Sequence, residues 1–322
     1  MQISPATIKN IDHAANLILK GGLVAFPTET VYGIGAIASN KNAINRIYSI
    51  KGRPKKNPLI VHIHSIDQVS TIVKCDDNTI SIIMEKFWPG PLTLVMEYKS
   101  SSLIHADARA NLNTIAVRIP SNPIAMRLLK KVNRPIIAPS ANTSEHLSPT
   151  KANHVNQDLG DKLNNQTDMI LDGGNCKIGI ESTVLDVTKN QVKVLRPGGF
   201  NIIKIKRYIK NIKSDHIENN NKPSSPGQFK KHYSPRASLR LNAQKPLNNE
   251  AWLGFGPDKI DLNCKFKMNL SKSGNLNEAA RNLFSMLRSL DKKNIDTIAI
   301  KSIPNRGIGL AINDRLIRGA SK

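Results

Sequence analysis

The chain has few aromatic residues, few cysteines and no long apolar run. Phe, Trp and Tyr make up 4% of its 322 residues, which argues against an aromatic sheet that stacks on single-stranded RNA. Cys75, Cys176 and Cys264 lie far apart without the spacing of metal ligands, as expected for thiols in a reducing compartment. No apolar stretch approaches the roughly 18 residues of a membrane span, and the first residues do not resemble a signal peptide. These absences predict a soluble, cytoplasmic protein with no membrane contact.

Several catalytic signatures are also missing from the sequence. There is no G-x-x-x-x-G-K-[ST], which excludes a P-loop enzyme, and no G-x-G-x-x-G that would support a dinucleotide site. No G-x-S-x-G motif offers an activated serine. Five histidines lack ligand spacing and are interpreted as ordinary surface or turn residues: His13, His105, His146, His154 and His216. We therefore predict no metal site built from protein ligands.

Negative charge is scarce. The 47 Lys and Arg residues against 24 Asp and Glu give a formal net charge of +23, which attracts polyanions such as nucleotides and tRNA. Between Lys204 and Arg240 ten cationic residues face only Asp215 and Glu218. Coding bias explains the same excess, because Lys, Asn and Ile are all frequent. Composition alone therefore does not decide between coding bias and a dedicated nucleic-acid-binding surface.

What the sequence does contain is an alternation of helical and strand patterns. The patterns predict helices over residues 5–20, 40–50, 67–73, 79–87 and 276–290, and strands over 23–26, 59–63, 92–96, 114–119, 135–138, 184–187, 191–195, 251–255 and 297–301. This alternation is typical of α/β folds. We predict an α/β domain with a twisted mixed sheet flanked by helices over residues 1–213, a linker over 214–236, and a smaller C-terminal α/β domain over 237–322.

Polar residues follow the first predicted strand. Thr28, Glu29 and Thr30 come directly after Pro27, at a strand end where α/β sheets tend to bind ligands. The glycines of the motif that follows, Gly33 and Gly35, allow either a close backbone approach or a positive φ. The segment predicts part of a ligand pocket.

Two cations follow the second predicted helix. Lys51 and Arg53 lie at its end, and Arg53 can make a forked contact with a phosphate. The same two residues can instead complement the helix dipole and face solvent. The pattern alone gives neither reading an advantage.

Three later clusters repeat the arrangement of polar residues at strand ends. Ser140 and Asn142 follow a buried strand, where they could bind a nucleotide or, more commonly, close a turn or cap a helix. Arg118 lies within a buried strand and needs an anionic partner, supplied by a protein or a ligand carboxylate. Arg196 ends another strand, after the motif that begins at Glu181.

Together these clusters resemble the threonylcarbamoyl-AMP synthase family, in its long form with a YrdC-like domain and an additional C-terminal Rossmann-like domain. The motifs that carry the resemblance, in chain order, are 27–33 (PTETVYG), 51–54 (KGRP), 57–62 (NPLIVH), 87–93 (FWPGPLT), 117–120 (VRIP), 140–142 (SAN), 181–184 (ESTV), 195–198 (LRPG), 225–227 (SPG), 231–233 (KHY), 281–284 (RNLF) and 311–315 (AINDR). Many members carry a glycine after the SAN turn, where this chain has Glu145-His146.

The resemblance implies an enzyme that makes threonylcarbamoyl-AMP and pyrophosphate from L-threonine, bicarbonate and ATP, with magnesium carried by ATP. The product would serve downstream machinery that modifies tRNA, and a weak contact with tRNA itself is part of this expectation. The residues implied for threonine are Thr30, His62, Arg118, Ala138 and Ser182, and those implied for ATP are Arg53, Asn57, Thr114, Ser140, Asn142, Ser148 and Arg196. Lys51 and Arg53 would act in catalysis, and Pro226, Gly227, His232 and Tyr233 would belong to a linker that folds over the pocket.

Two other functions are weighed against this one. A non-catalytic RNA-binding or ribosome-associated protein with a YrdC-like cavity would explain the charge but would leave Thr30, Arg118 and Ser182 without a task. A carbamoyl-transfer module of the hydrogenase-maturation type is disfavoured, because the chain lacks the acylphosphatase and zinc-finger segments that accompany that module.

Overall fold

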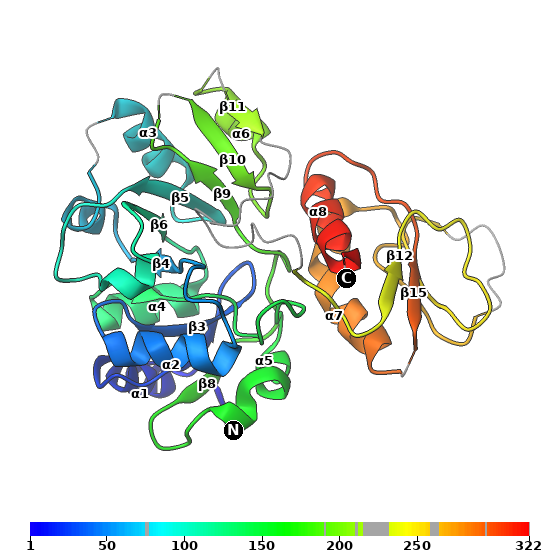
Figure 1. The fold of residues 1–322 in the computed structure, drawn as a ribbon, viewed down its shortest axis with the longest axis horizontal. Helices are drawn as coiled ribbons and strands as arrows, with labels where there is room; N and C mark the ends of the chain where they lie inside the picture. The colour runs from blue at the N-terminus through cyan, green and yellow to red at the C-terminus, as the bar shows by residue number, and fades with distance from the viewer. Residues whose placement is uncertain are drawn as a thin grey trace.

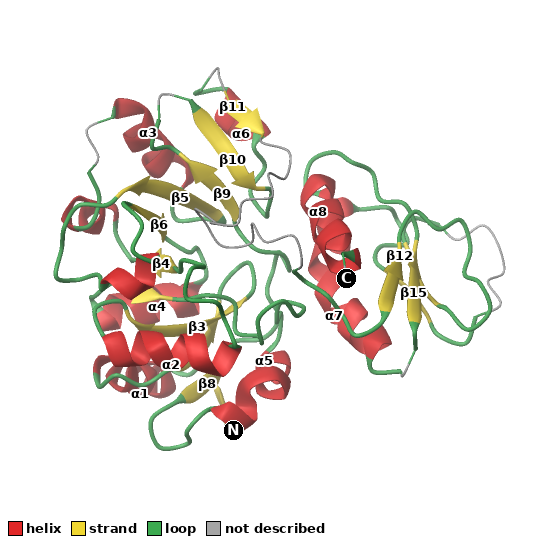
Figure 2. Ribbon diagram, viewed as in Figure 1, coloured by secondary structure: helices red, strands yellow, loops and turns green. Residues whose placement is uncertain are grey.

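The computed structural model describes residues 1–74, 77–189, 191–209, 212–214, 232–257, 264–293 and 295–321. Figure 1 shows a larger α/β body that carries the N terminus and a smaller one that carries the C terminus. Figure 2 shows that helices flank the strands in both bodies. The predicted fold class, a mixed sheet with helices plus a second α/β unit, is confirmed.

The larger sheet has eleven strands among the described residues, in the order β1-β8-β2-β3-β7-β4-β6-β5-β9-β10-β11. Their bounds are β1 Ile3–Pro5, β2 Val24–Pro27, β3 Tyr32–Ile37, β4 Ile60–His62, β5 Leu92–Glu97, β6 Thr114–Arg118, β7 Ile136–Ile137, β8 Met169–Asp172, β9 Thr183–Asp186, β10 Val192–Arg196 and β11 Ile212–Ser214. Parallel pairs, such as β4 with β6, alternate irregularly with antiparallel ones, such as β2 with β3. The sheet is therefore mixed.

Helices bury both faces of this sheet. Their bounds are α1 Ile8–Leu19, α2 Lys41–Lys51, η1 Ile66–Thr71, α3 Asn78–Phe87, η2 Ala106–Arg109, α4 Pro123–Val132, α5 Ala152–Leu159, η3 Gly160–Lys162 and α6 Ile203–Lys206. Because side chains alternate along a strand, Val24 and Phe26 pack with α1 and α4, while Ala25 belongs to the core cluster that includes α2. The helices leave the strand ends open for a site.

The N-terminal prediction was wrong at its start. Ser4 and Pro5 belong to β1, which pairs with β8, and α1 begins only at Ile8 with Thr7 as its N-cap. The Thr7 hydroxyl accepts a hydrogen bond from the Asn10 amide at 3.2 Å. Proline is tolerated in β1 because this strand lies at the edge of the sheet, where a missing N–H removes no ladder bond.

Strand β3 was not predicted from the sequence. Gly33 and Gly35 lie within it, and neither has a positive φ, so that reading of the two glycines was wrong. The close-approach reading is confirmed, because a Cβ on Gly35 would lie 2.7 Å from the Phe26 ring. Helices α4 and α5 and strand β8 were missed as well.

Of the histidines that were interpreted as surface or turn residues and that the structure describes, one was misread; His216 lies outside the described residues. His154 lies on α5 with only 8% of its surface exposed, not at the surface or in a turn. Its Nδ1 atom lies 3.3 Å from the Thr150 amide, which donates to it. Burial, followed by the positive charge of Arg288, lowers the pKa of His154 to about 3.

The C-terminal body has a four-stranded parallel sheet in the order β12-β15-β13-β14 among the described residues. Its elements are β12 Ser238–Arg240, β13 Ala251–Gly254, β14 Lys267–Asn269, α7 Leu276–Asp291, β15 Thr297–Ile300 and α8 Gly309–Ala320. The sequence patterns indicated β13, α7 and β15 and missed the other three. Arg288 of α7 joins the two bodies, because its guanidinium donates to Asp158 at 2.9 Å through Nη1.

The predicted linker is only partly described. Its first residue, Ser214, belongs to β11 of the larger sheet, and the structure describes the linker again from His232 onward. Pro226 and Gly227 lie outside the described residues. The domain boundaries at 213 and 237 therefore remain predictions.

Candidate functional site

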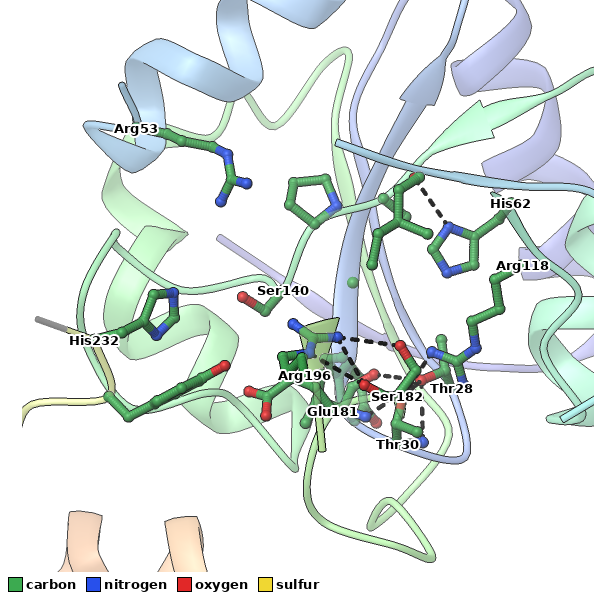
Figure 3. A pocket seen from close by; sticks show the side chains of 17 residues that line it. Thr28, Thr30, Arg53, His62, Arg118, Ser140, Glu181, Ser182, Arg196 and His232 are labelled. Atoms are coloured by element: carbon green, nitrogen blue, oxygen red, sulfur yellow. Dashed lines mark hydrogen bonds between the residues drawn. The ribbon is translucent and has the colours of Figure 1, made fainter. Parts of the chain in front are cut away.

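A cavity opens where several strands of the larger sheet end, as expected for α/β folds. The labelled residues in Figure 3 that line it are Thr28, Thr30, Arg53, His62, Arg118, Ser140, Glu181, Ser182, Arg196 and His232. The last residues of β4, β6 and β10 supply His62, Arg118 and Arg196. Figure 3 shows His62 and Arg118 on one side of the cavity and Arg53 and His232 on the other.

The turn between β2 and β3 holds Arg118. The Arg118 guanidinium donates to the Thr30 hydroxyl at 2.9 Å and to the Glu29 carboxylate at 2.6 Å, and its Nε donates to the Gly90 carbonyl at 3.2 Å. The Thr28 and Thr30 hydroxyls lie 2.7 Å apart and fix the turn. Of the two partners that the sequence left open for this buried arginine, the structure shows the protein carboxylate.

His62 lies beside Arg118 because β4 and β6 pair in parallel register at these two residues. The ring is 2% exposed, and its Nδ1 lies 3.2 Å from the Ile60 carbonyl. Burial, together with the nearby charge of Arg118, lowers the pKa of His62 to about 3. The ring is therefore neutral near pH 7, and its hydrogen-bonded Nδ1 acts as the donor.

Arg53 follows the end of α2, where Gly52 adopts a positive φ of 59°. Its Nε donates to the Asn57 carbonyl at 3.1 Å, and its Nη2 donates to Asn57 Oδ1 at 2.6 Å and to the Pro58 carbonyl at 2.8 Å. Burial lowers the pKa of Arg53 to about 10, so the group stays charged. All three of these acceptors are neutral oxygens.

Arg196 binds the segment in front of β9. Its Nε and Nη2 donate to the Ser182 carbonyl at 3.1 and 3.0 Å, and Nη2 donates to the Ser182 hydroxyl at 3.1 Å. The Thr93 hydroxyl of β5 lies 2.7 Å from the same Ser182 hydroxyl. These bonds hold Ser182 in the cavity wall.

Lys51 lies behind the cavity rather than in its lining. Its ammonium group donates to the Ser140 carbonyl at 2.6 Å and to the Asn142 carbonyl, and the residue is 1% exposed. Burial, followed by the charge of Arg53, lowers the pKa of Lys51 well below its usual value. The side chain supports the turn that carries Ser140.

That turn continues through Glu145, where many relatives were expected to have glycine. Glu145 has a φ of 69°, in the left-handed region that favours glycine. Its carbonyl accepts a hydrogen bond from the Ser234 amide at 2.8 Å. The chain therefore keeps a glycine-like conformation here with a residue that is strained by it.

His232 and Tyr233 cover the cavity from the C-terminal side. Burial lowers the pKa of His232 well below its usual value, and Arg53 and Arg196 lower it further. Tyr233 has a φ of 61°, is 2% exposed, and stacks on Phe284 with ring centroids 5.7 Å apart. With both rings in place the free volume is about 50 Å³, far below the roughly 300–1,000 Å³ of small-molecule sites.

The cavity gathers most of the predicted residues. The predicted residues that line it are Thr30, His62, Arg118, Ala138, Ser182, Arg53, Ser140, Arg196, His232 and Tyr233. Lys51, Asn57, Asn142 and Ser148 are buried outside its lining, and Thr114 is half-buried at the opposite end of β6 from Arg118.

Two carboxylates of the site received no role from the sequence. Glu29 binds Arg118, and Glu181 accepts from the Ser148 hydroxyl and from Arg315. Both lie within motifs that were quoted for the resemblance. The rule that a buried arginine needs an anion was the only signal for Glu29, whereas nothing local indicated the partner of Glu181.

The arrangement supplies three guanidinium groups around one cavity. One of them, Arg118, already has a carboxylate partner, while the hydrogen bonds described for Arg53 go to neutral oxygens. Arg53 is half-buried, and a guanidinium group whose described hydrogen bonds go to neutral oxygens remains suited to an anionic ligand. Among the described residues, no group of three or more His, Cys, Asp and Glu side chains is placed to hold a metal ion.

Comparison with known proteins agrees with this geometry. Residues 16–198 match the family model described as "Telomere recombination", which covers the Sua5, YciO and YrdC proteins, and residues 187–321 match "Threonylcarbamoyl-AMP synthase, C-terminal domain". The chain belongs to the threonylcarbamoyl-AMP synthase family. The recognition made from the motifs is thereby confirmed, and with it membership in an enzyme family that uses ATP.

Several family members align along nearly the whole chain. The threonylcarbamoyl-AMP synthases of Pyrococcus abyssi and Bacillus subtilis are each 38% identical, covering 94% and 96% of this chain and 92% of each relative. The crystal structure of P. abyssi Sua5 complexed with L-threonine has a TM-score of 0.90 at 35% identity, covering 99% of this chain and 98% of that one. A variant of the same protein, with a histidine and the next tyrosine changed to alanine, has a TM-score of 0.88.

Within the described ranges, no helix is both long and apolar enough to cross a bilayer.

Proposed function

We propose that this chain joins L-threonine, bicarbonate and ATP into threonylcarbamoyl-AMP and pyrophosphate. The observation that carries the proposal is the difference between two of the guanidinium groups, those of Arg118 and Arg53. Arg118 has a carboxylate partner, whereas Arg53 faces the same cavity bonded to neutral oxygens. A small zwitterion fits the first environment, and a triphosphate fits the second.

The threonine side of the pocket would be the wall of Thr30, His62, Arg118, Ala138 and Ser182. Arg118 has five N–H donors, of which its described hydrogen bonds use three, so it can still bind the amino acid carboxylate. The neutral ring of His62 adds no repulsion toward the substrate amine. These features support threonine as the ligand of this wall.

The nucleotide side would be the wall of Arg53, Ser140 and Arg196. Lys51 and Asn142 would act by holding the Ser140 turn, and Ser148 would act through Glu181. Asn57 and Thr114 are proposed for the part of ATP that extends beyond the present lining. Because the free volume is small, His232 and Tyr233 would have to move for ATP to enter.

The chemistry needs no enzyme nucleophile. The amine of threonine attacks the carbon of bicarbonate or of the carbon dioxide derived from it, which gives a carbamate and releases water or a proton. A carbamate oxygen then attacks the α-phosphorus of ATP, the bond to the β-phosphate oxygen breaks, and pyrophosphate leaves. The residues named here would position the reactants and stabilise charge on the phosphates, which lowers the barrier without a covalent intermediate.

Magnesium would enter as part of the MgATP substrate, where phosphate oxygens and water supply most of its ligands. The product is a mixed anhydride that water hydrolyses, so the covered cavity favours its survival. We place the reaction in the cytoplasm, where the product would be passed to the machinery that transfers the threonylcarbamoyl group to tRNA.

The deciding experiment measures pyrophosphate release and incorporation of labelled bicarbonate. Both should require threonine, and alanine in place of threonine is the matched control. Release of pyrophosphate without threonine would refute the proposal. Salt-dependent binding of tRNA with no turnover would favour the RNA-binding alternative instead.

A further inference from the structure

The last helix, α8, carries three buried charged residues on its inner side. Arg315 is 1% exposed, Arg318 is 4% exposed and Asp314 is 8% exposed. Arg318 donates to Asp314 at 3.0 Å, and Arg315 donates to the other Asp314 oxygen. Asp314 therefore fixes Arg315 from within the C-terminal domain.

From this position Arg315 contacts two residues that line the cavity of the larger domain. Its Nε donates to Glu181 Oε2 at 2.7 Å, and its guanidinium carbon lies 4.8 Å from the centre of the Tyr233 ring. Glu181 and Tyr233 both belong to the cavity lining, which Arg315 does not join. The arginine thus acts on the cavity from behind.

The contacted segment is held tightly. The Glu181 carbonyl accepts from the Gly199 amide at 2.9 Å, and a Cβ on Gly198 would lie 2.4 Å from the carbonyl carbon of Ser182. The other carboxylate oxygen of Glu181 accepts from Ser148. A change at Glu181 therefore reaches both Ser148 and Ser182.

We propose that Arg315 is a positioning residue for ATP: it neutralises Glu181 and holds the Tyr233 ring, so that the C-terminal domain completes the nucleotide side of the pocket. The proposal rests on the proposed function. Without Arg315 the Glu181 carboxylate would lose its ion pair and keep Ser148 as its hydrogen-bond partner among the described residues, so more of its negative charge would face the phosphates of ATP. Removal of the arginine therefore weakens ATP binding through repulsion as well as through lost packing.

The test compares Arg315→Met with Arg288→Met. Arg288 forms an ion pair across the same interface, with Asp158, and neither of these residues lines the cavity. Both variants should lower the melting temperature, because each leaves a carboxylate without its partner. Isothermal titration well below that temperature should show ATP affinity reduced about tenfold or more by Arg315→Met, and by less than about threefold by Arg288→Met.

A double variant separates an effect of Arg315 on the ATP site from a general loss of protein stability. Arg315→Met combined with Glu181→Gln removes the uncompensated carboxylate, so it should recover a large part of the lost ATP affinity. Threonine affinity, titrated without ATP, should change by less than about threefold in the two single arginine variants. If Arg315→Met does not fold, Arg315→Gln and Arg288→Gln, which also remove the positive charge, replace the two methionine variants in the same comparison.

Three outcomes would overturn the proposal: unchanged ATP affinity in the Arg315 variant, an equal loss in the Arg288 variant, or no recovery in the double variant. Pyrophosphate release by the unaltered protein is measured alongside. If that release fails while ATP binding responds as expected, the proposed reaction is wrong and the role of Arg315 in the nucleotide site stands.

Discussion

The two sides of the cavity use arginine differently. On one side, Arg118 donates to the Glu29 carboxylate at 2.6 Å and lies beside a neutral His62. On the other side, the three hydrogen bonds described for Arg53 go to the carbonyl and amide oxygens of Asn57 and Pro58. Among the described contacts, Arg118 is therefore neutralised by a carboxylate before any ligand arrives, whereas Arg53 is bonded to neutral oxygens.

This difference teaches how one pocket can distinguish two substrates. A neutralised arginine can still direct hydrogen bonds to a carboxylate, but it exerts little net attraction on a polyanion. An arginine whose described hydrogen bonds go to neutral oxygens keeps its charge for a polyanion and attracts it more strongly. The comparison predicts that replacing Arg118 and replacing Arg53 will have different effects on stability and on the binding of the two substrates.

The largest effect is expected for Arg118→Met. The change leaves Glu29 buried without its charged partner, which should lower the free energy of unfolding by about 3–5 kcal/mol. Threonine binding should also be lost. Denaturant unfolding and calorimetric titration with threonine measure the two losses. The double variant Arg118→Met, Glu29→Gln is the control: it should regain stability but not threonine binding, and a single variant as stable as the wild type would contradict the account.

Arg53→Ala should give a smaller and different result. Its removal leaves neutral acceptors rather than a buried carboxylate without a partner, so stability should fall less than in Arg118→Met. ATP affinity should fall about 30-fold, which corresponds to about 2 kcal/mol for the loss of hydrogen bonds to a charged phosphate. Titration with ATP and, separately, with threonine measures the contrast. An equal loss for both ligands would mean that the two sides of the cavity are not distinct.

A dependence of stability on pH should come from His62. Its folded pKa is about 3, and its unfolded value is near 6.5. Between these values the unfolded chain binds the extra proton, so acid favours unfolding. His62 alone should cost about 2 kcal/mol between pH 7 and pH 5. Urea titrations at both pH values should show the fall, and His62→Gln should reduce it by that amount; an unchanged pH profile in this variant would refute the assignment.

Much of the fold follows from local pattern, and the exceptions have physical causes. Continuous apolar runs indicated β4, β5 and β6. Helix α2 begins and ends close to the predicted positions, with Asn40 as its N-cap and Gly52 as its C-cap. Strand β3 was missed because two glycines interrupt its pattern, and its conformation is fixed by pairing with β2 and β7. Strand β1 was missed because its edge position, which tolerates Pro5, is a property of the assembled sheet.

The site divides in the same way. The residue types alone left two readings open for Arg53 and for Arg118, and the resemblance carried by the ordered motifs implied Arg53, Arg118 and Arg196 as binding groups; all three line the cavity. Placing Lys51 behind the Ser140 turn required the folded structure, because its two acceptors lie 89 and 91 residues away.

The sequence by itself determined which cationic and hydroxyl side chains end the strands, since hydrophobic patterning and turn residues act over short distances. Only the tertiary structure decided which of these cations already has a partner. Arg118 pairs with Glu29, which is 89 residues away along the chain, and Glu181 pairs with Arg315, which is 134 residues away. Neutralisation depends on distances in space between such remote segments. The Arg118–Glu29 distance is set when the larger domain folds, and the Glu181–Arg315 distance is set only when the C-terminal domain packs against it.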